Sequence, residues 1–311
     1  MKPQRISYLG PAGTFTQQAL LTQDDFSTLE HISLPTIYEV LEAASKGETE
    51  LGFAAIENSI EGTVNATLDA LTFELDLLIQ REVIHPVEMC LLITKGSSAN
   101  QIKRIVSFPH AIAQCHQYLK KRFPEATTIA ANSTAEAACG LGETADKETA
   151  VIATPLAALT YGLEILDRHI EDHPENHTRF VAVSSNGIPA PTGRDKTSIV
   201  TFQHANRPGS LVEILQEFST RSINLMHLQS RPTKRELGDY CFVIDLEGHI
   251  ADKRIADCLK TVQKNQAHVH FLGSYPSSGK HAIGAQNITS KTCYEAEDWI
   301  TELRKPQPSN S

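Results

Sequence analysis

The residues of this sequence best suited to chemistry are three neighbours, Thr178, Arg179 and Phe180. They combine a hydroxyl group, a permanent cation and an aromatic ring, which suits a small anionic ligand that carries a ring. A guanidinium can hold a carboxylate through two parallel hydrogen bonds. The alternative for Arg179 is a structural ion pair that faces outward, and the alternative for Phe180 is a place in the core.

Four further polar motifs lie upstream, where predicted strands end and predicted helices begin. Open α/β folds bind ligands at such junctions, because helix N-termini present unpaired N–H groups to anions. The candidate binding residues are Thr14 in GPAGTFT, Glu57 and Asn58 in ENSIEG, Ser107 and Gln114 around FPHAIA, and Ser133 and Thr134 in STAE. Helix capping is the alternative for Thr14, Ser107 and Ser133. Gln114 could instead lie on a solvated helix face, and ENSIEG could form an elaborate turn.

The composition is that of an ordinary globular protein of two domains. At 311 residues the chain is about twice a typical domain. It has no apolar stretch of about twenty residues that could cross a membrane, and its start lacks the apolar core of a signal peptide. A net charge of -9 argues against nucleic acid as a partner. We therefore expect a cytoplasmic protein that binds neither nucleic acid nor membrane.

Motifs for metals and cofactors are missing from the sequence. The six cysteines are scattered, with no pair at metal-ligand spacing, so we expect buried free thiols. Several histidines, among them His85 and His177, could act as acid or base, but none has the neighbours that specify a catalytic triad. We expect a site that uses no metal.

A stretch rich in Gly, Pro and Ser divides the chain at residues 184–196. Before it, short apolar runs alternate with helical patterns in two successive sets, which indicates α/β layers with mixed or parallel strands. After it, the patterns follow the order strand, helix, strand, strand, helix, strand of a ferredoxin-like βαββαβ unit. We predict domains at 4–183 and 197–276, a linker at 184–196 and a tail at 277–311.

Six motifs of the first domain, taken in order, resemble those of prephenate dehydratase. They are YLGPAGTFT, AAIENSIEGTVNATLD, SFPHAIAQC, NSTAEAA, TPLAALTYGLEIL and NHTRF. The second domain resembles an ACT domain at two motifs. These contain Pro208, Gly209, Ser210, Leu211 and Val212, in the place of the family's GALV-like motif, and Gln229, Ser230, Arg231 and Pro232, in the place of its ESRP-like motif.

The resemblance implies both a fold and a reaction. The fold is a two-lobed, periplasmic-binding-protein-like catalytic domain followed by a ferredoxin-like ACT domain. The reaction converts prephenate to phenylpyruvate with loss of water and carbon dioxide, in L-phenylalanine biosynthesis. Aromatisation of the ring drives it, so the resemblance implies neither a metal nor another cofactor.

The resemblance also assigns roles to the candidate residues. Thr178 matches the family's essential threonine, which is expected to serve the departing hydroxyl. Because a threonine hydroxyl is a weak acid, we favour hydrogen bonding in a dry cleft over donation of a free proton. The implied substrate contacts are Arg179, Phe180, Asn58, Ser107, Gln114, Ser133 and Thr134, with Thr14 and Glu57 as further candidates.

L-Phenylalanine is the implied effector of the second domain. The resemblance places it between subunits of a homodimer or homotetramer, near Asn206 and the two ACT motifs, where it would shift an open arrangement to a closed one. Two alternatives stay open. Arogenate dehydratase runs the same elimination on the aminated substrate, and a non-catalytic amino-acid sensor could use the same two domains.

Overall fold

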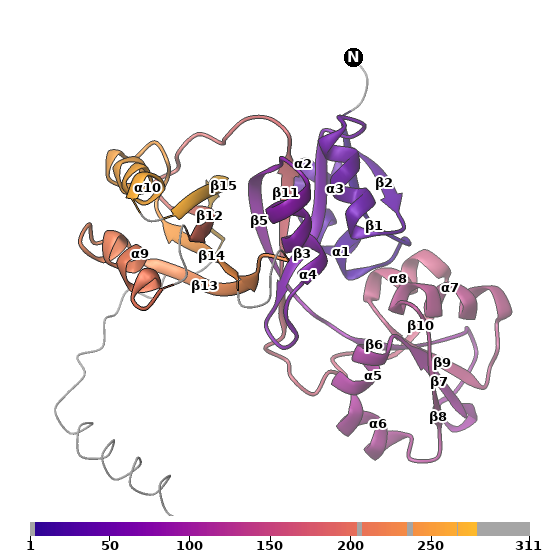
Figure 1. The fold of residues 1–311 in the computed structure, drawn as a ribbon. Helices are drawn as coiled ribbons and strands as arrows, with labels where there is room; N and C mark the ends of the chain where they lie inside the picture. The colour runs from indigo at the N-terminus through magenta and orange to yellow at the C-terminus, as the bar shows by residue number, and fades with distance from the viewer. Residues whose placement is uncertain (1–3, 204–206, 235–238, 266, 279–311) are drawn as a thin grey trace, which may run out of the picture. The chain divides into compact units, whose positions relative to one another are not determined.

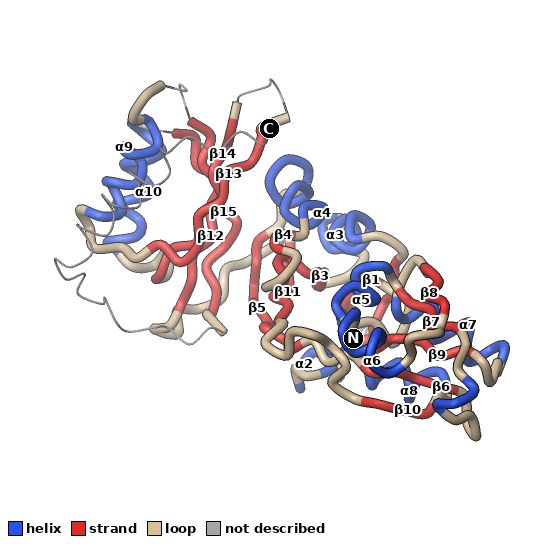
Figure 2. Tube along the Cα trace, turned by 90° about the horizontal axis from the view of Figure 1, so that it is seen from below, coloured by secondary structure: helices blue, strands red, loops and turns tan. Residues whose placement is uncertain are grey.

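Three β-sheets organise the part of the chain that the computed structural model describes (Figure 1, Figure 2). The described residues are 4–203, 207–234, 239–265 and 267–278. The predicted effector residue Asn206 and the predicted tail from residue 279 onward lie outside these ranges. The first two sheets form two lobes of the predicted catalytic domain, and the third forms a C-terminal unit.

The sheet of the first lobe has the strand order β2-β1-β3-β11-β5, with β4 paired to β3. Its strands are β1 (Arg5–Leu9), β2 (Glu30–Leu34), β3 (Leu51–Asn58), β4 (Gly62–Thr63), β5 (Leu78–Pro86) and β11 (His177–Ser184). Its helices are α1 (Phe15–Leu21), α2 (Asp24–Ser27), α3 (Ile37–Ser45), α4 (Asn65–Asp69) and the π-helical turn η1 (Ala70–Glu74). Strand β11 lies antiparallel between β3 and β5, whereas β1 is parallel to β2 and β3.

The sheet of the second lobe has the strand order β10-β6-β9-β7-β8. Its strands are β6 (Cys90–Ile93), β7 (Arg104–Ser107), β8 (Thr127–Ala130), β9 (Thr149–Ala153) and β10 (Glu164–Asp167). Its helices are α5 (Pro109–Gln114), α6 (His116–Arg122), α7 (Thr134–Thr144), α8 (Pro155–Tyr161) and the 3-10 turn η2 (Ala99–Gln101). Mixed strands with helices between them agree with the α/β prediction.

The chain crosses between the lobes twice. The first crossing follows β5 and the second follows β10. The two crossings lie side by side, because the Val87 N–H donates to the Asn176 carbonyl at 2.9 Å. This is the two-lobed, periplasmic-binding-protein-like arrangement that the sequence predicted, and it brings β11 back into the middle of the first sheet.

The C-terminal unit has the strand order β13-β14-β12-β15, which is the ferredoxin-like order that was predicted. Its elements are β12 (Asp195–Gln203), α9 (Ser210–Ser219), β13 (Leu225–Pro232), β14 (Tyr240–Glu247), α10 (Lys253–Asn265) and β15 (Ala267–Pro276). Helices α9 and α10 cover one face of the sheet, where Ile199, Ile214, Phe218 and Leu259 belong to one core (Figure 1).

The other face of the C-terminal sheet packs against the first lobe. Val200, Val243 and Leu272 share a single apolar core with residues of the first lobe, among them Leu71 and Ile79. Since successive side chains of a strand point to opposite faces, neighbouring residues of β12 serve different cores. Burial of each such aliphatic side chain contributes about 1.5–3 kcal/mol to folding.

The backbones of β15 and β5 approach each other closely at Gly273. A Cβ atom at this position would lie 2.6 Å from the carbonyl oxygen and 2.9 Å from the nitrogen of Ile79. Gly273 also has a φ of +136°, which side-chain-bearing residues rarely adopt. Glycine is therefore required here both by its backbone conformation and by the contact with Ile79.

Replacing Gly273 with alanine tests this contact. We expect a loss of roughly 2–4 kcal/mol in the free energy of unfolding, from the backbone conformation and from overpacking together. Gly193→Ala is the matched control, because Gly193 has a φ of +86° but no atom near its missing Cβ. It should lose only about 1–2 kcal/mol. Equal losses in denaturant titrations of the two variants would show that the close approach to Ile79 does not matter.

Candidate active site

Strand β11 places Thr178 and Arg179 on opposite faces of the first-lobe sheet. Thr178 pairs with Asn58 of β3 and His85 of β5, and Arg179 pairs with Glu57 and Ile84. Directly opposed residues of antiparallel strands point to the same face. The face of Thr178 therefore carries Asn58, and the opposite face carries Arg179 and Glu57.

The hydroxyl of Thr178 receives a hydrogen bond from Asn58. The Asn58 side-chain oxygen accepts the N–H groups of Ile60 at 2.9 Å and Glu61 at 3.0 Å. Because these two donors occupy the oxygen, the Nδ2 end of the amide must face Thr178, and it donates to Oγ1 at 2.9 Å. Thr178 thus accepts from Asn58, and its own hydroxyl proton has no acceptor among the residues that the structure describes.

Gln114, at the end of α5, brings the second lobe to the same network. Its Nε2 donates to the Glu61 carboxylate at 3.0 Å, and its Oε1 accepts from Nδ2 of Asn176 at 3.1 Å. Asn176 in turn accepts from Asn58 at 2.9 Å. The structure therefore brings together three of the predicted residues, Thr178, Asn58 and Gln114.

The other predicted polar residues of the cleft make contacts within their own lobes. Ser133 caps α7 by accepting from Glu136 N at 3.0 Å, and Thr134 is the first residue of that helix. Thr14 caps α1 and donates to the Leu9 carbonyl at 3.1 Å. The capping alternative thus describes Ser133 and Thr14. Contact of these residues with a substrate stays a prediction.

Ser107 does not cap a helix. Its hydroxyl is fully buried and donates to the Ile152 carbonyl at 2.7 Å, and Phe108 takes the cap position of α5. The capping alternative for Ser107 is therefore wrong, since its hydroxyl joins β7 to β9 instead.

The glycine-rich loop before α1 is held by the second lobe. Thr154 donates to the Gly13 carbonyl at 2.7 Å, and the Tyr161 hydroxyl donates to the Ala12 carbonyl at 2.7 Å. A Cβ atom at Gly13 would lie 3.0 Å from the Cα atom of Ala157. The backbone of this loop therefore lies close to helix α8.

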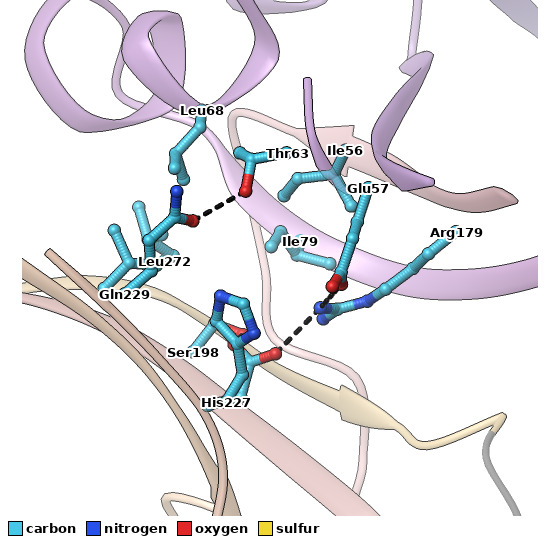
Figure 3. A pocket seen from close by; sticks show the side chains of 12 residues that line it. Ile56, Glu57, Thr63, Leu68, Ile79, Arg179, Ser198, His227, Gln229 and Leu272 are labelled. Atoms are coloured by element: carbon cyan, nitrogen blue, oxygen red, sulfur yellow. Dashed lines mark hydrogen bonds and ion pairs between the residues drawn. The ribbon is translucent and has the colours of Figure 1, made fainter. Parts of the chain in front are cut away.

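Arg179 forms a buried ion network on the face away from Thr178. Figure 3 shows the part of it that includes Glu57. The Nε of Arg179 donates to Glu82 at 2.8 Å, and its Nη1 lies 2.8 Å from the Asp245 carboxylate of β14. Its Nη2 donates to the Tyr275 hydroxyl at 2.8 Å, and Glu57 lies 3.6 Å away. The structure thus corrects the prediction that Arg179 and Glu57 hold a ligand beside Thr178, because strand alternation directs both away from it. Arg179 does form a structural ion pair, but the pair is buried and does not face outward as the alternative had it.

Phe180 is 1% exposed and stacks on Phe53, with ring centroids 5.3 Å apart. Both rings belong to the core of the first lobe, together with Val83. The structure therefore favours the core-filling alternative over contact with a ligand ring. The stack on Phe53 holds Phe180 in place, and Phe180 lies two positions after Thr178 in β11.

The carboxylates of the ion network are held in their charged form. Burial alone would raise the pKa of Glu82 and of Asp245, but the charges of Arg179 and Lys196 outweigh it and hold both pKa values below their usual range. Lys196 contacts Glu82 at 2.8 Å. The network therefore joins the first lobe to the C-terminal unit through fully charged partners.

A cavity of about 20 Å³ lies beside the ion network, which is room for one water molecule. It is lined by Glu57, Arg179, Asp245, His227 and Gln229 among others (Figure 3).

The predicted effector motif on β13 contacts the first lobe through alternate residues, Gln229 and Arg231. The Thr63 hydroxyl donates to the Gln229 side chain at 2.7 Å, and Arg231 donates to Asn65 at 2.6 Å and pairs with Asp69. Ser230 and Pro232, between and after them, are exposed. Only these two therefore remain open to a ligand on the far face.

The other effector motif opens helix α9. Gly209 is its N-cap with a φ of 87°, and Ser210 donates to the Arg207 carbonyl at 2.9 Å. Pro208 is exposed, Leu211 is half-buried, and Val212 is 55% exposed. A motif with so much exposed surface is compatible with a partner or ligand there.

Among the described residues, no helix is long and apolar enough to span a membrane. In the same part of the chain, no cluster of three or more His, Cys, Asp or Glu side chains could hold a metal ion.

Comparisons with known proteins agree with this arrangement. The family model for prephenate dehydratase matches residues 6–187, and that for the ACT domain matches residues 198–263. A curated prephenate dehydratase of Amycolatopsis methanolica is 37% identical over 97% of this chain and 98% of its own length. The crystal structure of prephenate dehydratase in complex with L-Phe from Arthrobacter aurescens has 36% identity and a TM-score of 0.82, and covers 96% of this chain and 99% of that one.

A second similar structure is that of GqqA, described as a novel type of quorum quenching acylases. It has 29% identity and a TM-score of 0.78, over 88% of this chain and 98% of that chain. One fold can thus be associated with different activities, so the site itself must decide the function.

Fold and site define a two-lobed α/β enzyme with a C-terminal ACT domain. The extent of these matches shows that the chain belongs to the prephenate dehydratase family. Its activity is the carbon–oxygen lyase reaction of that family. These matches confirm the predicted fold and function.

Several residues of these networks were missed in the sequence, among them Glu82 and Asn176. Glu82 is a charged residue at a core position of the apolar strand LIQREVIHP, a departure that signals a buried ion pair. Asn176 is the first letter of the NHTRF motif, and only its position beside Thr178 marked it.

The buried network predicts a large difference between two glutamate variants. Glu82→Gln leaves Arg179 and Lys196 poorly compensated and should lower the free energy of unfolding by about 3–5 kcal/mol at neutral pH. Glu148→Gln is the control, because it breaks an exposed pair with Lys103 (2.6 Å) and should change stability little. Denaturant titrations measure both, and equal losses would contradict the network.

The same network predicts how stability depends on pH. A carboxylate whose folded-state pKa is depressed stabilises the fold above its unfolded pKa of about 4, and the contribution is lost as the pH falls through the folded pKa. Since the pKa values of Glu82 and Asp245 are lowered, the difference between the parent and Glu82→Gln should shrink from pH 7 towards pH 3. A difference that stays constant over this range would rule out the linkage.

Proposed function

We propose that Thr178 is the group of this chain that assists loss of the hydroxyl when prephenate becomes phenylpyruvate. The observation that carries the proposal is the 2.9 Å hydrogen bond from Asn58 to the Thr178 oxygen. A hydroxyl that accepts a hydrogen bond becomes a better donor to the next group, because the two bonds polarise each other. Thr178 is thereby prepared to donate to a substrate oxygen.

The reaction requires a hydrogen-bond donor at one atom, the oxygen of the departing hydroxyl group. The bond from the ring to its carboxylate breaks, its electron pair enters the ring, and the C–O bond at the opposite ring carbon breaks. The leaving oxygen gains negative charge as it departs, takes up a proton and leaves as water. A preorganised donor at that oxygen is worth about 3 kcal/mol of the barrier.

Neutral groups are proposed to hold the anionic substrate. Arg179 is engaged with Glu82 and Asp245 on the other face, so the carboxylates must be met elsewhere. Gln114 offers its Nε2, and the N-terminus of α7 at Ser133 and Thr134 offers hydroxyl and backbone N–H groups. Ser107 is not part of this set, because its fully buried hydroxyl already donates to the Ile152 carbonyl.

The proposal extends to the remaining parts of the chain. We assign catalysis to residues 4–183, a linker to 184–196, effector binding to 197–276, and no function to the tail at 277–311. The proposed effector is L-phenylalanine, in keeping with the L-Phe complex of the similar structure. We further propose a homodimer or homotetramer in the cytoplasm.

Turnover by Thr178 variants tests the catalytic proposal. The purified protein should form phenylpyruvate from prephenate, followed by its ultraviolet absorbance. Thr178→Ala should lower kcat about 100-fold or more with an unchanged Tm, whereas Thr178→Ser keeps the hydroxyl and most of the activity. Near-normal turnover in Thr178→Ala would exclude the proposed role. Arogenate, assayed in parallel, decides between the two dehydratases, and no turnover of either substrate would leave the amino-acid sensor.

Calorimetry and inhibition test the regulatory proposal. L-Phenylalanine should bind the whole chain and inhibit it, and D-phenylalanine should do neither. Thr63→Val removes the hydrogen bond from Thr63 to Gln229 without changing the shape of the side chain. We expect this variant to bind L-phenylalanine with an affinity within about threefold of the parent, and to be inhibited less, since coupling between sites is typically 1–3 kcal/mol. Absence of binding heat in the parent would refute the effector assignment.

A further inference from the structure

Asn176 occupies a position where a polar side chain is costly. It is 1% exposed, at the end of the second crossing between the lobes and directly before β11. Its backbone carbonyl accepts from Val87 in the first crossing, so its place in the fold is fixed from both sides. A buried amide must find partners for its oxygen and for its nitrogen.

The partners of Asn176 come from both lobes. Its Oδ1 accepts from Nδ2 of Asn58 at 2.9 Å and from the Ser59 hydroxyl at 3.2 Å, both in the first lobe. Its Nδ2 donates to Oε1 of Gln114 at 3.1 Å, in the second lobe. One amide thus contacts two predicted site residues with opposite ends.

These contacts decide which atoms the neighbouring amides can offer. On Asn58, Oδ1 is occupied by the turn, so Nδ2 donates to Asn176 and Thr178, with a longer contact of 3.4 Å to the His177 carbonyl. On Gln114, Oε1 accepts from Asn176, so Nε2 is the end that points away from Asn176. One of the two Nε2 protons goes to Glu61. A second proton of Gln114 Nε2 remains for a ligand.

We infer that Asn176 is a positioning residue that sets the orientation of the Gln114 amide, so that Gln114 turns a donor toward the substrate. The inference rests on the proposed function, since an anionic substrate that loses a hydroxyl needs donors and not acceptors. If Gln114 were reversed, its carbonyl oxygen would face an anion. Asparagine suits the task because it accepts at one end and donates at the other.

The variant Asn176→Asp distinguishes the accepting end of the side chain from its donating end. The carboxylate still accepts from Asn58 and Ser59 but cannot donate to Gln114. The Gln114 amide should therefore turn its nitrogen to residue 176 and its oxygen outward, and give up its bond to Glu61, an exposed side chain that can turn to water. We expect KM for prephenate to rise about tenfold or more while kcat falls much less, because a lost hydrogen bond to a charged group costs that much in affinity. Asn176→Ala should lower kcat/KM by about tenfold or more as well.

A double-mutant cycle with Gln114→Ala distinguishes orientation from charge. Where residue 114 has no amide to orient, Asn176→Asp should change KM by less than about twofold, because coupled residues are not additive. If KM still rises tenfold in that background, the new negative charge is responsible and the inference is overturned. Parental KM and kcat in folded Asn176→Ala or Asn176→Asp would overturn it as well.

Ser7→Ala is the matched control for the loss of a buried polar group. Ser7 is fully buried in β1, and its hydroxyl donates to the Val40 carbonyl at 2.8 Å, apart from the residues of the cleft network. This variant should lose stability with KM and kcat unchanged, and a KM shift like that of Asn176→Asp would reduce the role of Asn176 to general stability. Since the parent is assayed first, an inactive parent sinks the proposed function, whereas an active parent with unaffected Asn176 variants sinks only this inference.

Discussion

Every second side chain of β11 lies on the same face of its sheet, so Thr178 and Arg179 must point in opposite directions. One face of the strand carries the hydroxyl and its amide partner, and the other carries the cation that meets the C-terminal unit. A slip of one residue along the neighbouring strands would exchange the two faces. The Thr178 hydroxyl and the contact between domains are therefore fixed by one hydrogen-bond register.

The cation on the far face is tolerable only because acidic partners surround it. Burial would expel an isolated guanidinium, but Glu82 and Asp245 lie within 2.8 Å of Arg179. One of these carboxylates belongs to β5 and the other to β14, so each domain supplies part of the compensation. Strand β13 adds a further contact, because its Gln229 accepts from the Thr63 hydroxyl. Thr63 of β4 pairs in turn with Glu57 of β3. A shift of the C-terminal sheet would thus be felt at the strand that carries Asn58.

Local signals in the sequence were sufficient for the α/β class and for the ferredoxin-like unit, because apolar period and turn residues act over short stretches. They also singled out Thr178, Asn58 and Gln114 as candidates, which the structure brings into one network. Arg179 was assigned to the ligand because a guanidinium can hold a carboxylate, although a period of two along HTRFVAVS directs it away from the Thr178 face. Its partner Glu82 lies 97 residues away, and pairing over such a distance leaves no local pattern.

The apolar core shared by the first lobe and the C-terminal sheet has a consequence for how the chain could be divided. Residues 185–194, between β11 and β12, are mostly exposed and carry none of that core. A protease that cut there would produce two fragments that still bury Leu71 and Ile79 against Val243 and Leu272. The nicked protein would behave as a non-covalent complex, and the halves could be expressed as separate chains that find each other. The C-terminal unit is thus held to the first lobe mainly by its packed core, and the covalent linker contributes less.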